Sequence, residues 1–232
     1  MYFDSSYLCF AIPGLLLALV AQFMVKSAYA RYAKVPVERG VNGVEMAKML
    51  MRQTGVQVGV EAIGGELTDH YDPRGKVMRL SDSSRFNSVA SVAVVAHEFG
   101  HAMQDAEGYG PLKLRGAIVP AVQVSSWVGP ILFLVGAGLV GLQTALGASL
   151  AWLGVIAFGL AALFSIVTLP VEFDASRRAL AMLQATNVMN PDEMSGAKKV
   201  LNAAALTYVA AAAQSLLTLL YYVTRLTGRS RD

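Results

Sequence analysis

A stretch of 56 residues without a charged side chain constrains this sequence more than any other feature. Between Arg115 and Glu172 there is no Asp, Glu, Lys or Arg. About 20 apolar residues cross the hydrocarbon core of a bilayer as a helix, so this stretch is long enough for two crossings and a turn. Because 55% of the chain is hydrophobic and only 15% is charged, an ordinary soluble fold is excluded and a transmembrane hairpin is predicted.

Two further uncharged stretches lie near the ends of the chain, Ser5 to Val25 and Val200 to Thr224, with 21 and 25 residues. Each is long enough to span a bilayer. The first has an alternative interpretation as a cleaved signal peptide, but the chain has no Lys or Arg before Lys26, which argues against it. The sequence therefore predicts about four membrane helices, at residues 5–25, 117–142, 146–169 and 201–224.

The polar segments between these helices, residues 26–115 and 170–199, are expected on one side of the membrane. A hairpin begins and ends on the same face, so the chain after it returns to the side it left. The two segments hold sixteen Lys and Arg residues, against three beyond the last apolar stretch. The positive-inside rule therefore places them in the cytoplasm, although the terminal arginines then lie outside unless residues 201–224 do not cross fully.

The net charge and the cysteine content limit the kinds of partner and metal site that the chain can have. A net charge of +3 is too small and too dispersed to indicate nucleic acid binding, and it suits basic loops beside a lipid bilayer. The single cysteine, Cys9, lies in the first apolar stretch and allows neither a disulfide within the chain nor a thiolate metal cluster.

The segment 26–115 has the periodicities of a small α+β unit. They predict a helix at 44–54, strands at 56–61 and 77–80 with a turn at 72–75 before the second, and a helix at 88–104. Gly55 ends the first helix, and Ser88 is a suitable N-cap for the last, which is largely apolar. The expected fold class is mainly α, with about four integral membrane helices and a small α+β unit at the membrane surface.

The segment His97-Glu98-Phe99-Gly100-His101 has the strongest chemical signal, because it lies on the predicted buried helix. Two histidines four residues apart project from one face of a helix and can bind a single Zn²⁺. Glu98 is rotated by about 100° from His97 and can act as a general base beside the open position of the metal. The chain has only three histidines, and two of them are in this pattern.

A catalytic zinc site needs a third protein ligand, and the candidates are Glu172, His70 and several carboxylates in the segment 26–115. Glu172 follows Pro170 at an expected helix start, where an acid can also simply stabilise the helix dipole. His70, in Asp69-His70-Tyr71-Asp72, is a candidate ligand, substrate contact or transition-state donor, or alternatively part of a network that stabilises a turn.

Several neighbouring side chains are candidates for supporting roles. Asp105, four residues after His101, can accept the free N–H of an imidazole, or can be a solvated residue at the helix end. Tyr109 and Arg115 follow closely and can stabilise an oxyanion, or can be structural. Asp174 is at helical salt-bridge spacing from two arginines, which is the simpler interpretation of its charge.

The segments Leu67 to Pro73, Leu80-Ser81, Ala96 to Asp105, Pro170 to Ser176 and Ala205 to Ala211 together resemble the YugP-like family of bacterial neutral membrane zinc metallopeptidases. The resemblance covers most of the chain. It implies a zincin-like unit with a gluzincin-type site, in which His97, His101 and Glu172 bind one Zn²⁺ per chain and Glu98 is the base. It also implies the bacterial inner membrane as the location.

More distantly, Glu172 to Ala179 is similar to the third-ligand helix of the larger heat-shock and prenyl-protein membrane metallopeptidases. Those proteins usually have Asp four residues after the ligand Glu, and Ser176 stands at that place here. Asp105, Asp174 and Ser176 are therefore the side chains expected to support the ligands.

The sequence thus predicts a zinc metalloendopeptidase acting on a peptide or membrane-protein substrate. A zinc hydrolase of a non-peptide substrate and an inactive zinc-binding membrane scaffold are the alternatives. The presence of Glu98, a potential base, argues against the scaffold. A structural zinc site would also close its fourth position with another Cys or His, and the sequence has none nearby. The substrate is expected to lie extended along an exposed strand of residues 56–80, because a peptidase must hold the peptide in register over the metal.

Overall fold

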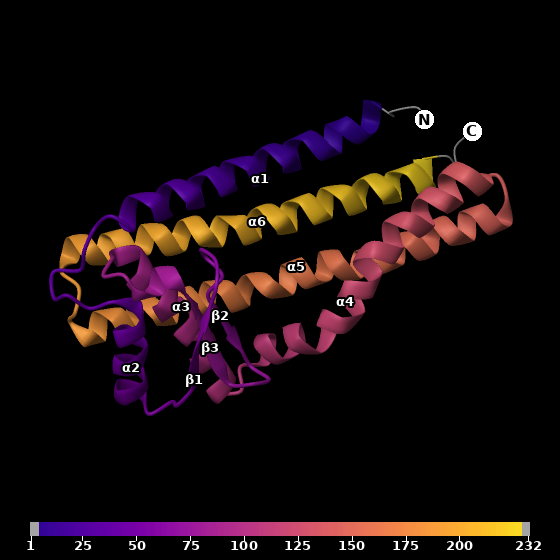
Figure 1. The fold of residues 1–232 in the computed structure, drawn as a ribbon. Helices are drawn as coiled ribbons and strands as arrows, with labels where there is room; N and C mark the ends of the chain where they lie inside the picture. The colour runs from indigo at the N-terminus through magenta and orange to yellow at the C-terminus, as the bar shows by residue number, and fades with distance from the viewer. Residues whose placement is uncertain (1–4, 229–232) are drawn as a thin grey trace. The chain divides into compact units, whose positions relative to one another are not determined.

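The structure, a computed structural model, describes residues 5–228 (Figure 1). The chain divides into two compact units. The helical unit comprises the residues up to Val20, Leu114 to Leu169, and the residues from Tyr208 onward. The α+β unit comprises Ala21 to Lys113 and Pro170 to Thr207.

Helices dominate the secondary structure, as the sequence predicts. The α-helices are α1 (Ser5–Tyr32), α2 (Gly43–Thr54), α3 (Val89–Ala106), α4 (Gly110–Leu134), α5 (Ala145–Thr186) and α6 (Pro191–Thr227). A 3₁₀ turn, η1 (Asp82–Arg85), precedes α3, and a π-helical segment, η2 (Val135–Gly141), follows α4. The strands β1 (Gly59–Ile63), β2 (His70–Asp72) and β3 (Val77–Ser81) form one sheet.

Within residues 5–228, four helical segments are long and apolar enough to span a membrane, which agrees with the predicted number. They are Tyr7–Tyr32, Gly110–Gly141, Ala145–Thr186 and Pro191–Thr227. A bilayer core is about 30 Å thick and a helix rises about 1.5 Å per residue. The 42 residues of α5 and the 37 of α6 exceed that length, so each helix is longer than one crossing requires.

α5 continues through Pro170, where the sequence predicted a helix start, and that prediction was wrong. Proline inside a helix removes one backbone hydrogen bond and crowds the preceding turn. Here the turn that follows is held by packing, since Val171 and Ala175 are fully buried. The segment predicted at 170–199 is therefore the end of α5 and the start of α6, separated by a short turn.

In the helical unit, α4 and α5 form an antiparallel hairpin (Figure 1). Glycines bring their backbones into contact: a Cβ on Gly129 would lie 2.8 Å from the amide N of Phe158, and one on Gly154 would lie 2.5 Å from that of Phe133. Phe133 in turn stacks on Tyr222 of α6, with ring centroids 4.1 Å apart. Small residues allow such close approach of helices in membranes.

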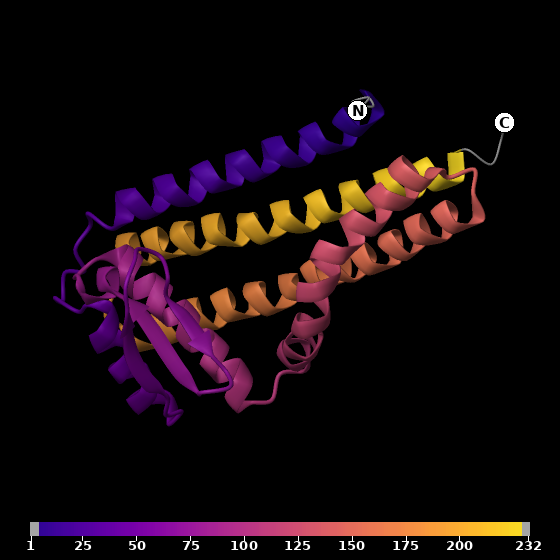
Figure 2. The same ribbon diagram turned by 45° about the vertical axis from the view of Figure 1, so that its right-hand side comes forward.

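The sheet of the α+β unit has the strand order β1-β3-β2, with β1 parallel and β2 antiparallel to β3. β3 agrees with the predicted strand at 77–80, whereas β1 begins at Gly59, three residues later than predicted. β2 was not predicted, because His70-Tyr71-Asp72 is short, polar and adjacent to a turn. One face of the sheet lies on α3 (Figure 2).

α3 is the central helix of the α+β unit. Ser88 caps its start by accepting a hydrogen bond from the Ser91 amide, as predicted. Gly55 ends α2 in the left-handed conformation, with φ of 76°. The core around α3 is made by residues from each neighbouring element, including Met46 and Leu50 of α2, Met78 and Leu80 of β3, Leu183 of α5 and Leu201 of α6.

Candidate metal centre

α3 presents His97 and His101 on one face, one turn apart. Their ring centroids are 4.8 Å apart and the ring planes are inclined by 82°. This follows from the spacing, because residues i and i+4 of a helix are neighbours on its surface. His101 is buried and His97 is partly buried. The two imidazoles are therefore directed at one enclosed point.

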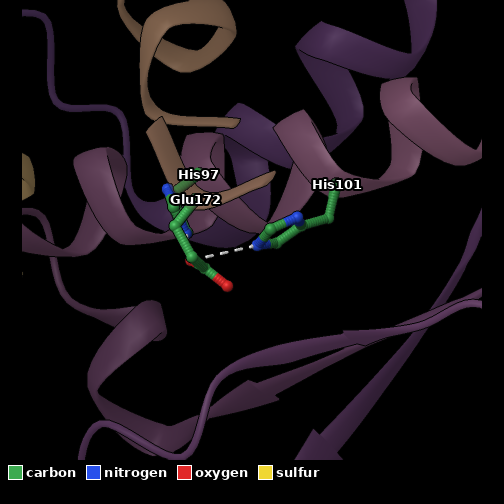
Figure 3. Close-up of side chains that lie close together, drawn as sticks. All are labelled: His97, His101 and Glu172. Atoms are coloured by element: carbon green, nitrogen blue, oxygen red, sulfur yellow. Dashed lines mark hydrogen bonds and ion pairs between the residues drawn. The ribbon is translucent and has the colours of Figure 1, made fainter. Parts of the chain in front are cut away.

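α5 supplies Glu172, whose carboxylate reaches the two imidazoles (Figure 3). Glu172 Oε2 lies 3.2 Å from His97 Nε2 and 3.5 Å from His101 Nε2. One potential ligand atom from each of the three residues lies within 4.8 Å of the others. The residue is only 2% exposed, and a carboxylate so far from water needs a positively charged partner.

Gly100 lets α3 and α5 approach closely at this point. A Cβ on Gly100 would lie 2.5 Å from the carbonyl oxygen of Ala175, which is three residues after Glu172. Any larger residue would push the two backbones apart. The glycine between the two histidines therefore sets the distance over which Glu172 reaches them.

The chemistry of these three side chains fits a zinc ion. Two Nε2 atoms and a carboxylate converge on one point, which is favourable only when a proton or a cation lies among them. Burial by itself lowers the pKa of His101, but the carboxylates of Glu172 and Glu98 raise it by more, so the pKa lies above its ordinary value. The cluster thus attracts positive charge, and two imidazoles with one carboxylate are a ligand set of catalytic zinc sites.

The Nδ1 atoms of both imidazoles face hydrogen-bonding partners outside the cluster. Ser176 Oγ lies 3.1 Å from His97 Nδ1, and Gln104 Oε1 lies 3.0 Å from His101 Nδ1. A partner at Nδ1 orients the ring and leaves Nε2 for a metal. The sequence predicted a supporting role for Ser176 but not for Gln104, although a polar residue one turn after His101 on a buried helix was the available signal.

Glu98 lies on α3 beside the histidines and is held by the edge of the sheet. The backbone N–H of Tyr71 in β2 donates to Glu98 Oε2 at 2.9 Å. Burial raises the pKa of the Glu98 carboxyl above its ordinary value. The sequence did not predict this contact, because it depends on the pairing of β2 with β3 and not on any local pattern.

Asp105 has a different partner from the imidazole, which was one of the two alternatives that the sequence left open. Its Oδ2 accepts a hydrogen bond of 2.8 Å from the phenol of Tyr71. Burial, followed by this bond to a carboxylate, raises the pKa of the Tyr71 phenol well above its usual range. β2 is therefore fastened to α3 at two points, one through the backbone and one through the side chain of the same residue.

Asp174 is buried and joins α5 to the end of α3. Its carboxylate accepts hydrogen bonds from Gln104, from Arg178 at 2.6 Å and from Arg177. Arg178 also donates to Glu107 Oε2 at 2.7 Å. The predicted pairing of Asp174 with two arginines is present. The same carboxylate also accepts a hydrogen bond from Gln104, the residue that contacts His101.

The other three candidates, His70, Tyr109 and Arg115, are not among the residues that form this cluster. His70 is exposed, and its Nδ1–H donates to the carbonyl oxygen of Thr68 at 2.8 Å. Side chains alternate along a strand, so His70 faces away from the side on which Tyr71 meets α3. Tyr109 lies against Arg178, 5.8 Å from ring centroid to guanidinium carbon, and Arg115 belongs to the helical unit.

This fold and this site define a membrane protein with a candidate two-histidine, one-glutamate metal centre and an adjacent carboxylate. The chain belongs to the family described as "Putative neutral zinc metallopeptidase", which matches residues 7–227. It is 43% identical over 219 residues to the "Putative membrane protease YugP" of Bacillus subtilis (strain 168), across 94% of this chain and 95% of that protein. No solved structure matches the chain. The family resemblance seen in the sequence is confirmed.

Proposed function

We propose that this chain is a zinc metalloendopeptidase of the membrane, in which His97, His101 and Glu172 bind one zinc ion and Glu98 is the general base. The convergence of the two Nε2 atoms and the buried Glu172 carboxylate supports this most strongly. His97 and Glu172, which meet at this point, are 75 residues apart in the chain. The family membership and the name of the Bacillus relative point to the same activity.

The side chains of His97, His101 and Glu172 are arranged to bind a doubly charged cation. Zinc, when bound, supplies a Lewis acid that polarises a carbonyl group and lowers the pKa of water to about 7. The residues of the chain direct both Nε2 atoms at one point and add one negative charge from Glu172. Burial of Glu172 and His101 excludes bulk water from the ligands, which strengthens electrostatic interactions there.

Glu98 accepts the proton of the attacking water. Tyr71 holds Oε2, so the other oxygen, Oε1, is the one that takes the proton. The raised pKa of the carboxyl makes it a stronger base than an exposed glutamate, in keeping with the need for a base near the working pH. The same carboxyl then returns the proton to the leaving amine.

The substrate backbone lies extended along β2. This strand is an edge of the sheet, and the Tyr71 N–H that points away from β3 meets Glu98. An extended peptide on that edge would place its carbonyl groups beside the base. Cleavage is therefore expected in unfolded or flexible segments near the membrane. Equal cleavage rates for compact proteins and for their unfolded forms would contradict this expectation.

His70 stays a candidate transition-state donor. Because its Nδ1–H is engaged with a carbonyl oxygen, Nε2 of the neutral ring is an acceptor, so donation from Nε2 requires the imidazolium form. Its role is tested below by a variant that leaves the proposed ligands intact.

The catalytic side is proposed to face the bacterial cytoplasm, as the distribution of Lys and Arg indicates. Of the three arginines beyond the last apolar stretch, Arg225 is in α6, and the other two lie outside the described residues. A cysteine at Gly75, in a chain with Cys9→Ala, reports the orientation. Labelling of that cysteine from outside intact cells would contradict the cytoplasmic assignment.

The proposal is tested with detergent-purified protein by zinc analysis after dialysis and by hydrolysis of casein or labelled peptides. Glu98→Gln should keep zinc and lose turnover, because an amide fills the same space without accepting the proton. Glu172→Ala should lose both, since two imidazoles hold zinc far more weakly than three ligands. His70→Ala should keep zinc, with lower activity if His70 serves the transition state.

Two outcomes would overturn parts of this proposal. Zinc retained in Glu172→Ala but lost in His70→Ala would exchange the two residues as third ligand. Zinc bound by the wild-type chain without cleavage of any peptide would contradict the peptidase assignment and favour a non-peptide substrate or a scaffold.

A further inference from the structure

We propose that Gln104 is a positioning residue that fixes the tautomer of His101 and fastens the Glu172 turn of α5 to α3. The inference rests on the proposed metal centre and adds a residue that the HExxH pattern does not contain.

Three hydrogen bonds surround the Gln104 amide, which is completely buried. Oε1 lies 3.0 Å from His101 Nδ1. Nε2 donates to the carbonyl oxygen of Val171 at 2.8 Å and to Asp174 Oδ2 at 2.9 Å. Both amide hydrogens and the amide oxygen are therefore engaged.

These partners allow only one orientation of the amide. The Val171 carbonyl can only accept, and the Asp174 carboxylate, paired with Arg177 and Arg178, also accepts. A flipped amide would turn its oxygen towards two acceptors while buried, which is strongly unfavourable. The NH₂ group must face α5, so Oε1 must face His101.

The orientation of the amide determines where the proton of His101 lies. Because Oε1 is an acceptor, Nδ1 of His101 must be the protonated nitrogen, which leaves a lone pair on Nε2 directed at Glu172. His97 has no such constraint, because the Ser176 hydroxyl beside its Nδ1 can donate or accept. Gln104 is therefore the group that imposes a tautomer on the pair.

The same side chain also sets the position of the third ligand. Its two donor bonds reach residues 171 and 174, which lie on either side of Glu172. The same amide contacts His101, which lies three residues before Gln104 on α3. One side chain therefore links proposed ligands from two helices. Loss of Gln104 should disturb both the proton on His101 and the register of Glu172.

The first test is the variant Gln104→Met, which keeps the length of the side chain and removes every hydrogen bond. Zinc affinity of the detergent-purified full chain is measured by competition with a chelator. Loss of a partner of this kind lowers metal affinity by about 10–100-fold, and that is the expected fall. Gln184→Met makes the same chemical change at an exposed position of α5 and is the matched control, with wild-type affinity expected.

A spectroscopic readout separates loss of the hydrogen bond between Gln104 and His101 from a general loss of packing. The chain has only three histidines, so ¹⁵N-histidine labelling gives a spectrum that one His70→Ala variant can help assign. In the zinc-loaded wild-type chain, His101 should show a protonated Nδ1 in slow exchange with water. In Gln104→Met that slowly exchanging proton should disappear.

A compensating pair covers the case in which Gln104→Met does not fold. Gln104→Glu keeps an acceptor for His101 but opposes both the carbonyl oxygen of Val171 and the carboxylate of Asp174. Adding Asp174→Asn supplies an amide donor to the new carboxylate. The double variant should therefore bind zinc at least about tenfold more tightly than Gln104→Glu alone.

Several results would overturn the inference. These are wild-type zinc affinity in a folded Gln104→Met chain, an unchanged His101 Nδ1 signal in that variant, or a double variant no better than Gln104→Glu. A wild-type chain that binds no zinc would instead refute the proposed metal centre, and this inference with it.

Discussion

Replacing Gly100 by alanine tests whether backbone contact between α3 and α5 sets the metal geometry. The added Cβ would lie 2.5 Å from the Ala175 carbonyl oxygen, whereas ordinary van der Waals contact begins at 3.4 Å. The difference means that the helices must separate by about 0.9 Å, and overpacking of this kind costs about 1–3 kcal/mol. Zinc–ligand distances vary by only about ±0.2 Å, so moving Glu172 this far should weaken zinc binding at least tenfold.

The assay is zinc competition with a chelator, run beside a thermal unfolding curve for the same sample. Gly110→Ala is the matched control, because it adds the same methyl group where nothing lies within 4 Å. The clash at Gly100 is with a main-chain oxygen, so no side-chain change at Ala175 should relieve it. A folded Gly100→Ala chain with wild-type zinc affinity would refute the reasoning.

Three further predictions follow from the same contacts. Removing zinc with a chelator should lower the unfolding temperature, because a metal present at 1,000 times its dissociation constant stabilises the folded state by about 4 kcal/mol, and adding zinc should restore it. Tyr71→Phe loses the bond to Asp105, worth about 1 kcal/mol, so turnover should fall several-fold while the zinc content measured by elemental analysis is unchanged. Gly154→Ala should lower thermal stability in detergent by about 1–3 kcal/mol, because its Cβ would meet the α4 backbone, whereas Gly138→Ala enters open space and should have little effect.

The sequence predicted the elements whose signals are local. The four apolar helices follow from charge-free stretches, and α3 follows from an apolar run that begins at an N-cap serine. β2 was missed, because three polar residues before a turn acquire strand geometry only by pairing with β3. The continuation of α5 through Pro170 was missed for a related reason, since tertiary packing there outweighs the helix-breaking tendency of proline.

The site was predictable to the extent that one helix could specify it. His97, Glu98 and His101 follow from the spacing along α3, while Glu172 was chosen among alternatives with the help of the family resemblance. The structure brings that glutamate to the two imidazoles, which supports the choice. The contacts of Gln104 with Asp174 and of Tyr71 with Glu98 could not be inferred, because they join residues 70 and 27 positions apart, and a single sequence gives no information on such pairs. Only the contact of Gln104 with His101 had a local signal.

All of the contacts that shape the site share α3 as one partner. The sheet reaches it through Tyr71, which holds Glu98 and Asp105, and α5 reaches it through Glu172 and the bonds of Gln104. Movement of either neighbour relative to α3 would therefore separate the base or the third ligand from the histidines, even with the HExxH segment intact. It follows that a chain with the histidines and Glu98 but without Gly100 or Gln104 should keep the helix and bind zinc poorly.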